Sequence, residues 1–179
     1  MTELDLSGTA LGWLPSGKAI AGSDIRPDDV LIGFPSSGIH SNGFSLVRKV
    51  VSKSGMSLTE PCPFSPEHES RSVEFDHGDL GSVLLNPTRI YVDPIVELLF
   101  SDMAICKRES IHGIAHITGG GLSNLLRLNQ SVQFLIADPL DPQPEFEWIA
   151  SEGQVSDWEM HRVFNLSLIH ISEPTRLEP

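Results

Sequence analysis

Two short stretches of this 179-residue chain carry side chains that could do chemistry. The first is the segment 36–43, where His40 stands among serine, asparagine and glycine residues. An imidazole exchanges protons near neutral pH more readily than other side chains. The glycines permit tight backbone paths, and Ser41 or Asn42 could cap a helix that follows. Free amides at such a helix start suit an anion such as phosphate. The alternative is a glycine-serine turn with one hydrogen-bonded structural histidine.

The elements that would position this loop lie on either side of it. Val30–Phe34 is a short apolar, β-branched run, which predicts a buried strand. Leu46, Val47, Val50 and Val51 recur at helical spacing after the loop. We therefore expect a strand, a polar loop and a helix start.

The second stretch is 111–121, an apolar run that ends in three glycines. The alternation predicts a strand, and the residues 122–128 predict a helix start. Thr118–Gly121 could hold phosphate with backbone amides, although the spacing matches no standard phosphate-binding pattern. On a strand, His112 and His116 would stand about 13 Å apart at roughly 3.3 Å per residue, so we expect no shared metal ion.

Arg89 is a third candidate, because its guanidinium offers a planar fork to a phosphate or another anion. Thr88 and Arg89 follow Pro87, which bars a regular helix there, and both are expected to be exposed. A structural ion pair is the alternative role for Arg89.

The composition bounds the function further. The formal net charge of -12 argues against nucleic acid or an anionic membrane as a partner, but not against a phosphorylated small molecule. The two cysteines form no zinc or disulfide pattern. No apolar run is long enough for a membrane span, and the N-terminus has no signal-peptide pattern, so a soluble, cytoplasmic protein is expected.

Other segments carry structural predictions only. Residues 54–81 read as a long surface loop in which His68 and His77, among acidic residues, are more simply solvated than metal-binding. The remaining expectations are a helix capped by Asp93 and running to about Asp102, a strand at Val132–Ala137, a short helix from Glu145, and a helix through Phe164 that begins with a capping box at Ser156.

Four segments in order resemble one family, phosphoribosylformylglycinamidine cyclo-ligase, also called aminoimidazole ribonucleotide synthetase. They are SSGIHSNGFSLVRK at 36–49, NPTRIYV at 86–92, HITGGGL at 116–122 and VSDWEMHRVFN at 155–165. The resemblance implies an α/β domain with a mixed sheet packed by helices. It also implies ATP-dependent closure of formylglycinamidine ribonucleotide to aminoimidazole ribonucleotide, in purine synthesis.

The resemblance also implies roles for the candidate residues. His40 would donate to, or orient, the formyl oxygen or the transferred phosphoryl group, with a pKa suited to proton exchange near neutrality, and Asn42 would position it with Ser41. The residues expected to bind substrate or phosphate are Ser36, Ser37, Gly38, Ser41, Gly43, Thr88, Arg89, Thr118, Gly119, Gly120 and Gly121.

The family has an N-terminal domain with a DGVGTK segment for ATP and Mg²⁺, which also forms its homodimer, and this chain has no such segment. We therefore expect residues 1–12 to be the end of a linker, 13–166 the C-terminal synthetase domain, and 167–179 a foreign tail that could still pair as a strand. Such a fragment should be inactive alone. The alternatives are a relative of selenophosphate synthetase, thiamine-phosphate kinase or a hydrogenase maturation protein, or a non-catalytic domain that needs a separate ATP-binding partner.

Overall fold

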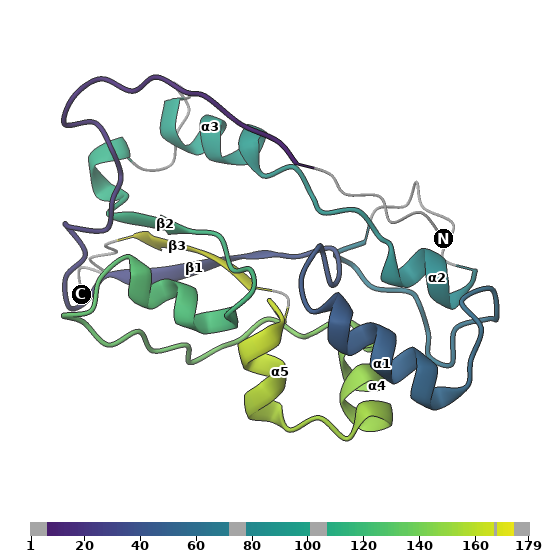
Figure 1. Ribbon diagram of the computed structural model, residues 1–179. Helices are drawn as coiled ribbons and strands as arrows, with labels where there is room; N and C mark the ends of the chain where they lie inside the picture. The colour runs from purple at the N-terminus through teal and green to yellow at the C-terminus, as the bar shows by residue number, and fades with distance from the viewer. Residues whose placement is uncertain (1–6, 72–77, 101–106, 167, 174–179) are drawn as a thin grey trace.

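The computed structural model describes residues 7–71, 78–100, 107–166 and, for the backbone, 168–173. Its elements follow one another along the chain as Figure 1 shows. They are β1 (Val30–Pro35), α1 (Phe44–Ser54), α2 (Leu80–Leu84), α3 (Val92–Phe100), the 3₁₀ turn η1 (Arg108–Ser110), β2 (Gly113–Ala115), the 3₁₀ helix η2 (Gly121–Arg127), α4 (Pro144–Gly153), α5 (Asp157–Val163) and β3 (Leu168–Glu173).

The three strands form one sheet in the order β1-β3-β2, so the last strand of the chain lies at its centre. β3 runs antiparallel to both neighbours, with Pro35 opposite Leu168 and Gly113 opposite Ser172. The predicted α/β fold is confirmed. Both pairings among the described strands are antiparallel, so the mixed character of the sheet remains a prediction.

β1 is half-buried, and the prediction of a fully buried strand is wrong. Val30 and Ile32 are 38% and 40% exposed, whereas Leu31 packs toward a small cluster around Ile117. The physical reason is that β1 is an edge strand whose successive side chains point to opposite faces.

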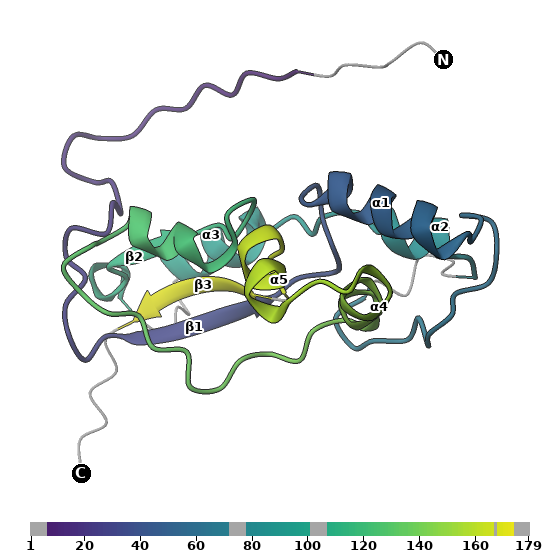
Figure 2. The same ribbon diagram turned by 60° about the horizontal axis from the view of Figure 1, so that its bottom comes forward.

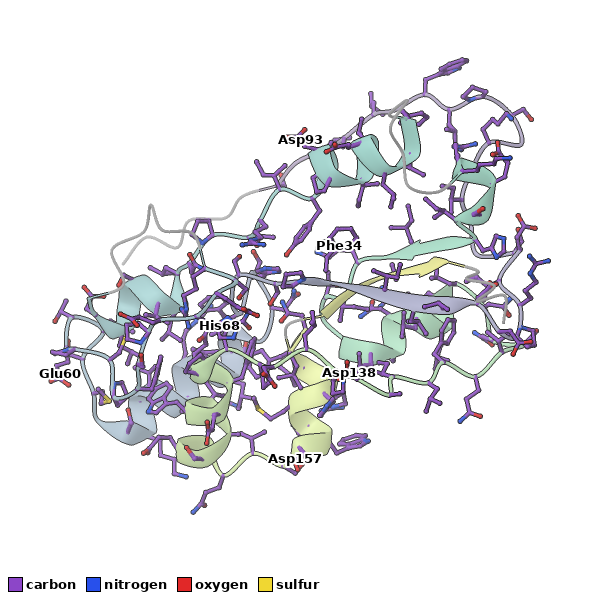
Figure 3. The ribbon with its side chains drawn as sticks, turned by 180° about the vertical axis from the view of Figure 1, so that it is seen from behind. Phe34, Glu60, His68, Asp93, Asp138 and Asp157 are labelled. Carbon is purple, nitrogen blue, oxygen red and sulfur yellow. The ribbon has the colours of Figure 1, made fainter. Side chains whose placement is uncertain are left out.

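The helices fall into two groups. α1, α2 and α4 gather beyond the carboxyl end of β1, whereas α3 and η2 accompany the strands (Figures 1 and 2). Seen from behind, Phe34 stands near the end of β1 on the side of α3 (Figure 3). The loop that leaves β1 therefore passes from the sheet into the helical group.

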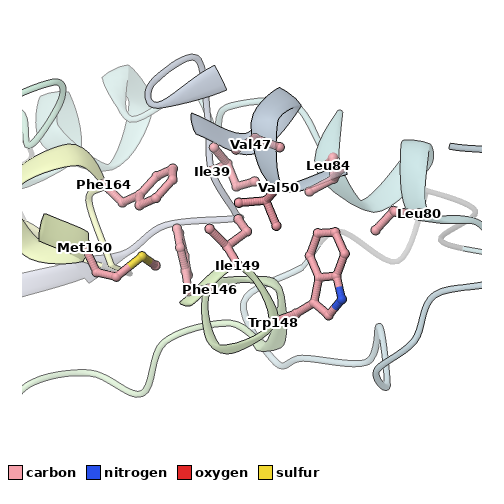
Figure 4. Close-up of a cluster of buried hydrophobic side chains, with 10 residues drawn as sticks. All are labelled: Ile39, Val47, Val50, Leu80, Leu84, Phe146, Trp148, Ile149, Met160 and Phe164. Carbon is pink, nitrogen blue, oxygen red and sulfur yellow. The ribbon is translucent and has the colours of Figure 1, made fainter. Parts of the chain in front are cut away.

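The main core lies within the helical group (Figure 4). Phe146 of α4 and Phe164 after α5 meet edge to face with ring centroids 5.5 Å apart, and both are 1% exposed. Ile39, also 1% exposed, joins this core from the loop next to His40. The candidate loop is thus anchored by burial of an apolar side chain.

Most predicted helices are confirmed, with differences at their starts. α4 and α5 form as expected. The Ser156 side chain accepts the Glu159 amide at 3.3 Å, but the Glu159 carboxylate bonds Arg162, so the predicted capping box is only half formed. The predicted cap at Asp93 is wrong, because α3 begins at Val92 and includes Asp93 in its first turn. Its predicted end at Asp102 lies outside the described residues. The predicted cap of α1 by Ser41 or Asn42 is also wrong, since Gly43 occupies that position in a left-handed conformation without a side-chain cap.

The strand predicted at Val132–Ala137 is not formed. Phe134 and Ile136 pack against the small cluster at Ile117, so the alternating pattern reflects burial of one face without ladder pairing. A cavity of about 490 Å³ lies between this segment and β1, lined by Leu31, Gly33 and Leu135 among others. The long loop predicted at 54–81 is irregular over 55–71 and 78–79, apart from a single bridge between Pro61 and Asp79, but its predicted end is wrong because the buried Leu80 and Gly81 already belong to α2.

Candidate functional site

The two glycine-containing loops meet in space. The Gly119 amide donates to Oδ1 of Asn42 at 3.0 Å, although 77 residues separate them. The Tyr91 ring lies between the two histidines, with its centroid 6.2 Å from His40 and 6.2 Å from His116. Three segments that are remote in sequence therefore share one surface.

His40 is buried just beneath this surface. It adopts a left-handed φ of 60° and is 6% exposed. Its Nε2 lies 3.2 Å from the Ser37 amide and 3.3 Å from the Ser37 hydroxyl, and its Nδ1 lies 3.2 Å from the Asn165 amide nitrogen. Both ring nitrogens thus already have partners within the chain.

Burial lowers the pKa of His40 to about 4, and the positive charges of His116 and Arg89 add to the effect. The imidazole is therefore neutral at pH 7. The expectation that it exchanges protons near neutrality is wrong, because sequence alone does not reveal how far a side chain is removed from water. A neutral imidazole still offers one donor and one acceptor.

Buried polar side chains hydrogen-bond to the backbone of the 36–43 loop, and the sequence analysis did not predict them. The Gln143 amide donates to the Ser36 carbonyl at 2.5 Å and to the Ser70 hydroxyl at 2.7 Å. The Asn86 amide donates to the Ser37 carbonyl, and Asn165 reaches the Gly38 carbonyl at 3.2 Å. Gln143 and Asn165 are almost fully buried, yet isolated polar residues beside apolar runs give no sequence signal for this role.

An ion pair between Arg71 and Glu145 lies buried under the same loop. Glu145 is fully buried, which raises the pKa of its carboxyl, while Arg71 acts in the opposite direction. A side chain at Gly38, where φ is 151°, would come within 3.1 Å of the Glu145 carboxylate. Glycine is required at this position because the loop approaches a buried charge closely.

The exposed rim of the site carries the anion-binding candidates. Thr88, Arg89, Ser41, Gly119 and His116 are exposed, in contrast to the buried run from Ser36 to His40. The segment with Arg89 is fixed by two hydrogen bonds, from the Ser37 hydroxyl to the Pro87 carbonyl at 2.8 Å and from the Tyr91 hydroxyl to the Pro35 carbonyl at 3.2 Å. The backbone on either side of Arg89 is thus fixed next to the 36–43 loop.

The glycine loop is partly used by the chain itself. The Gly119 amide is bonded to Asn42, and the Gly121 amide donates to the Thr118 carbonyl at 2.9 Å. A Cβ at Gly121 would lie 1.7 Å from the His161 carbonyl oxygen of α5. Two of the three glycine amides are therefore committed, and Gly121 serves close packing. The half-buried Thr118, Gly120 and Gly43 are the remaining candidates of the two loops.

The two histidines of the second stretch have separate environments. His112 is buried and its Nδ1 lies 2.8 Å from Oδ2 of Asp29, whereas His116 is exposed. Over the described ranges no three histidine, cysteine, aspartate or glutamate side chains gather as metal ligands would. His68 bonds to Ser70, and His77 lies outside the described residues. In the same ranges no helix is both long and apolar enough to cross a membrane.

Comparisons with known proteins identify the family. A family model described as AIR synthase related protein, C-terminal domain, matches residues 26–174. The chain is 41% identical over 164 residues to a phosphoribosylformylglycinamidine cyclo-ligase from Methanosarcina acetivorans, and 44% identical over 170 residues to one from Gloeothece citriformis. These alignments cover 92% and 93% of the chain but only 44% and 45% of the relatives, so the chain spans less than half of their length. The chain therefore belongs to the AIR synthase related family and carries its C-terminal domain.

Proposed function

We propose that this chain is the C-terminal domain of a phosphoribosylformylglycinamidine cyclo-ligase, which closes the imidazole ring of aminoimidazole ribonucleotide at the expense of ATP. The names of the relatives support this activity. The observation that carries it is the hydrogen bond between Asn42 and Gly119, because it joins the two most family-like loops into one site. A phosphorylated ribonucleotide is the proposed substrate.

The proposed chemistry is activation of the formyl oxygen by phosphorylation, followed by attack of the amidine nitrogen on the formyl carbon with loss of phosphate. Such a reaction depends chiefly on positioning and on charge stabilisation. Arg89 and Thr88, with the amides and hydroxyls of the two loops, would hold the substrate phosphate. His40, neutral, buried and bonded within the chain at both ring nitrogens, would keep the 36–43 loop in the position that orients the formyl group rather than lose a proton. His116 is the exposed imidazole of the site and the better placed of the two to meet a ligand.

ATP and Mg²⁺ are proposed to bind mainly outside this chain. The described residues offer Mg²⁺ no cluster of carboxylates, and the two committed glycine amides limit what the loop at Thr118–Gly121 offers a nucleotide. We therefore assign both to the part of the complete enzyme that precedes this domain. A homodimer in the cytoplasm is part of the same proposal.

The proposed domain limits follow the family pattern, with residues 1–12 as linker and 13–166 as the synthetase domain. A mixed sheet in the complete domain also belongs to this proposal. We also propose that residues 167–179 are a foreign tail, but two findings weigh against this part of the proposal. The family match runs to residue 174, and β3 pairs with both other strands.

A chimera tests the proposal most directly. The matching region of the Methanosarcina acetivorans relative is replaced by this chain, and the product is incubated with ATP, Mg²⁺ and formylglycinamidine ribonucleotide. We expect cyclisation by the chimera and none by the chain alone. Asn42→Ala in the chimera should lower turnover by about tenfold or more, since loss of precise positioning is costly. Ser45→Ala, an exposed change on α1, is the control.

The outcomes separate the proposal from its alternatives. A folded chimera that binds ATP but cannot cyclise the substrate would point to a selenophosphate synthetase or thiamine-phosphate kinase type of activity. Cyclisation by the chain alone at ordinary enzymatic rates would show that the ATP site is not outside it.

A further inference from the structure

Asn165, the second residue after α5, is buried at 1% exposure and touches the candidate loop at three points. Its amide nitrogen lies 3.2 Å from the Gly38 carbonyl oxygen and 3.2 Å from Nδ1 of His40. Its Oδ1 accepts the Ser36 hydroxyl at 3.3 Å. We propose that Asn165 is a positioning residue that fixes the orientation of the His40 ring and holds it as the Nε2–H tautomer.

The Gly38 carbonyl can only accept a hydrogen bond. It therefore selects the NH₂ side of the Asn165 amide, and the same NH₂ group faces Nδ1 of His40. A nitrogen that receives this hydrogen must present a lone pair. In a neutral imidazole the proton then resides on Nε2.

The other ring nitrogen faces the hydroxyl and the backbone amide of Ser37, which favour opposite tautomers. The Ser37 hydroxyl donates its hydrogen to the Pro87 carbonyl at 2.8 Å. Its oxygen can therefore accept a hydrogen bond from Nε2 of His40 at 3.3 Å. The competing arrangement has Nε2 accept the Ser37 amide at 3.2 Å, with the proton on Nδ1, and this amide hydrogen is the group that the proposed tautomer sets against the Nε2 hydrogen. That tautomer requires a rotated Asn165 amide, which would set Oδ1 3.2 Å from the Gly38 carbonyl oxygen, two acceptors face to face.

The groups around His40 keep its imidazole ring neutral, so only the two neutral tautomers need to be compared. The charged or titratable groups that act on His40 are Arg89 on the rim segment and His116 after β2, and the Tyr91 ring packs between the histidines. Both cationic groups disfavour an imidazolium at this position. The catalytic consequence of the tautomer rests on the proposed function, but the tautomer itself does not.

The experiment is ¹⁵N NMR of the histidine rings of the intact chain, with His40 assigned by its loss in His40→Gln. We expect a protonated Nε2 and an unprotonated Nδ1 at pH 7. In Asn165→Asp the carboxylate can only accept, so the proton should move to Nδ1 and the pKa of His40 should rise by roughly 1–3 pH units, as beside an opposite charge. Asn129→Asp is the matched control, because Asn129 bonds the carbonyls of Gly22 and Ile25 instead.

Two results would overturn the proposal. One is a protonated Nδ1 in the unmodified chain, a measurement that does not depend on any variant folding. The other is an unchanged tautomer in both Asn165→Asp and Asn165→Leu. Loss of cyclisation in the chimera with an intact Nε2–H signal would count against the proposed function and leave the role of Asn165 standing.

Discussion

The three consecutive glycines after Thr118 should respond very differently to substitution by alanine. Gly121 has φ 56°, and its Cβ would lie 1.7 Å from the His161 carbonyl oxygen, so α5 must move. Gly120 has φ 103°, but its nearest neighbour is the Ser123 hydroxyl at 3.3 Å. Gly119 has no such backbone conformation, and a methyl group there would meet only Oδ1 of Asn42 at 3.6 Å.

The magnitudes follow from these geometries. A left-handed alanine costs about 1–2 kcal/mol, which is the expectation for Gly120→Ala. Gly121→Ala adds the displacement of α5 and partial exposure of Phe164, worth a further ~2–3 kcal/mol. Its total of about 3–5 kcal/mol is a large part of the roughly 5–15 kcal/mol that stabilises a typical protein. Gly119→Ala should remain within about 0.5 kcal/mol.

Urea unfolding followed by tryptophan fluorescence provides the assay. With a slope of about 2 kcal/mol per molar, the midpoints should fall by roughly 1.5–2.5 M for Gly121→Ala and 0.5–1 M for Gly120→Ala, and by less than about 0.3 M for Gly119→Ala. Phosphate binding should also be measured on the folded variants. Weaker binding by Gly119→Ala would indicate that the anion contacts the backbone at Gly119. Equal midpoints for the Gly119 and Gly121 variants would refute the claim that Gly121 serves packing.

Three further predictions concern stability. The pKa of His40 is about 4 in the folded chain and 6.5 ordinarily, so the unfolded chain binds more protons between these two pH values. The free energy of unfolding should therefore fall by up to about 3 kcal/mol as the pH drops from 6.5 to 4. The unfolding midpoints of His40→Gln over the same pH range should lack this contribution. Ser156→Ala should cost about 1 kcal/mol through the lost cap of α5, while Ser156→Asp should retain most of it; equal losses would contradict the capping role. Phe146→Ala should cost about 3–5 kcal/mol in chemical denaturation, against almost nothing for the exposed Leu126→Ala.

The sequence determined those features that depend on local pattern. The apolar spacing after Gly43 forms α1, and the serine at 156 caps α5, whereas phosphate binding by the two family-like loops remains a prediction. Each of these rests on neighbours in the chain, whose hydrogen bonding and periodicity can be read along it. The family follows from the same loops, because their residue types and order are specific.

Tertiary structure alone decided how the site is built. The neutral state of His40 comes from burial and from the charges of Arg89 and His116, which lie 49 and 76 residues away in sequence. The buried partners of the loop, Gln143 and Asn165, come from the far end of the chain. Such contacts depend on distance in space, and a buried polar group must find a partner wherever the fold supplies one. The segment Val132–Ala137 is a second example. Its alternating pattern correctly indicated which side chains pack inward, but it could not indicate whether another strand lies close enough to pair with the segment.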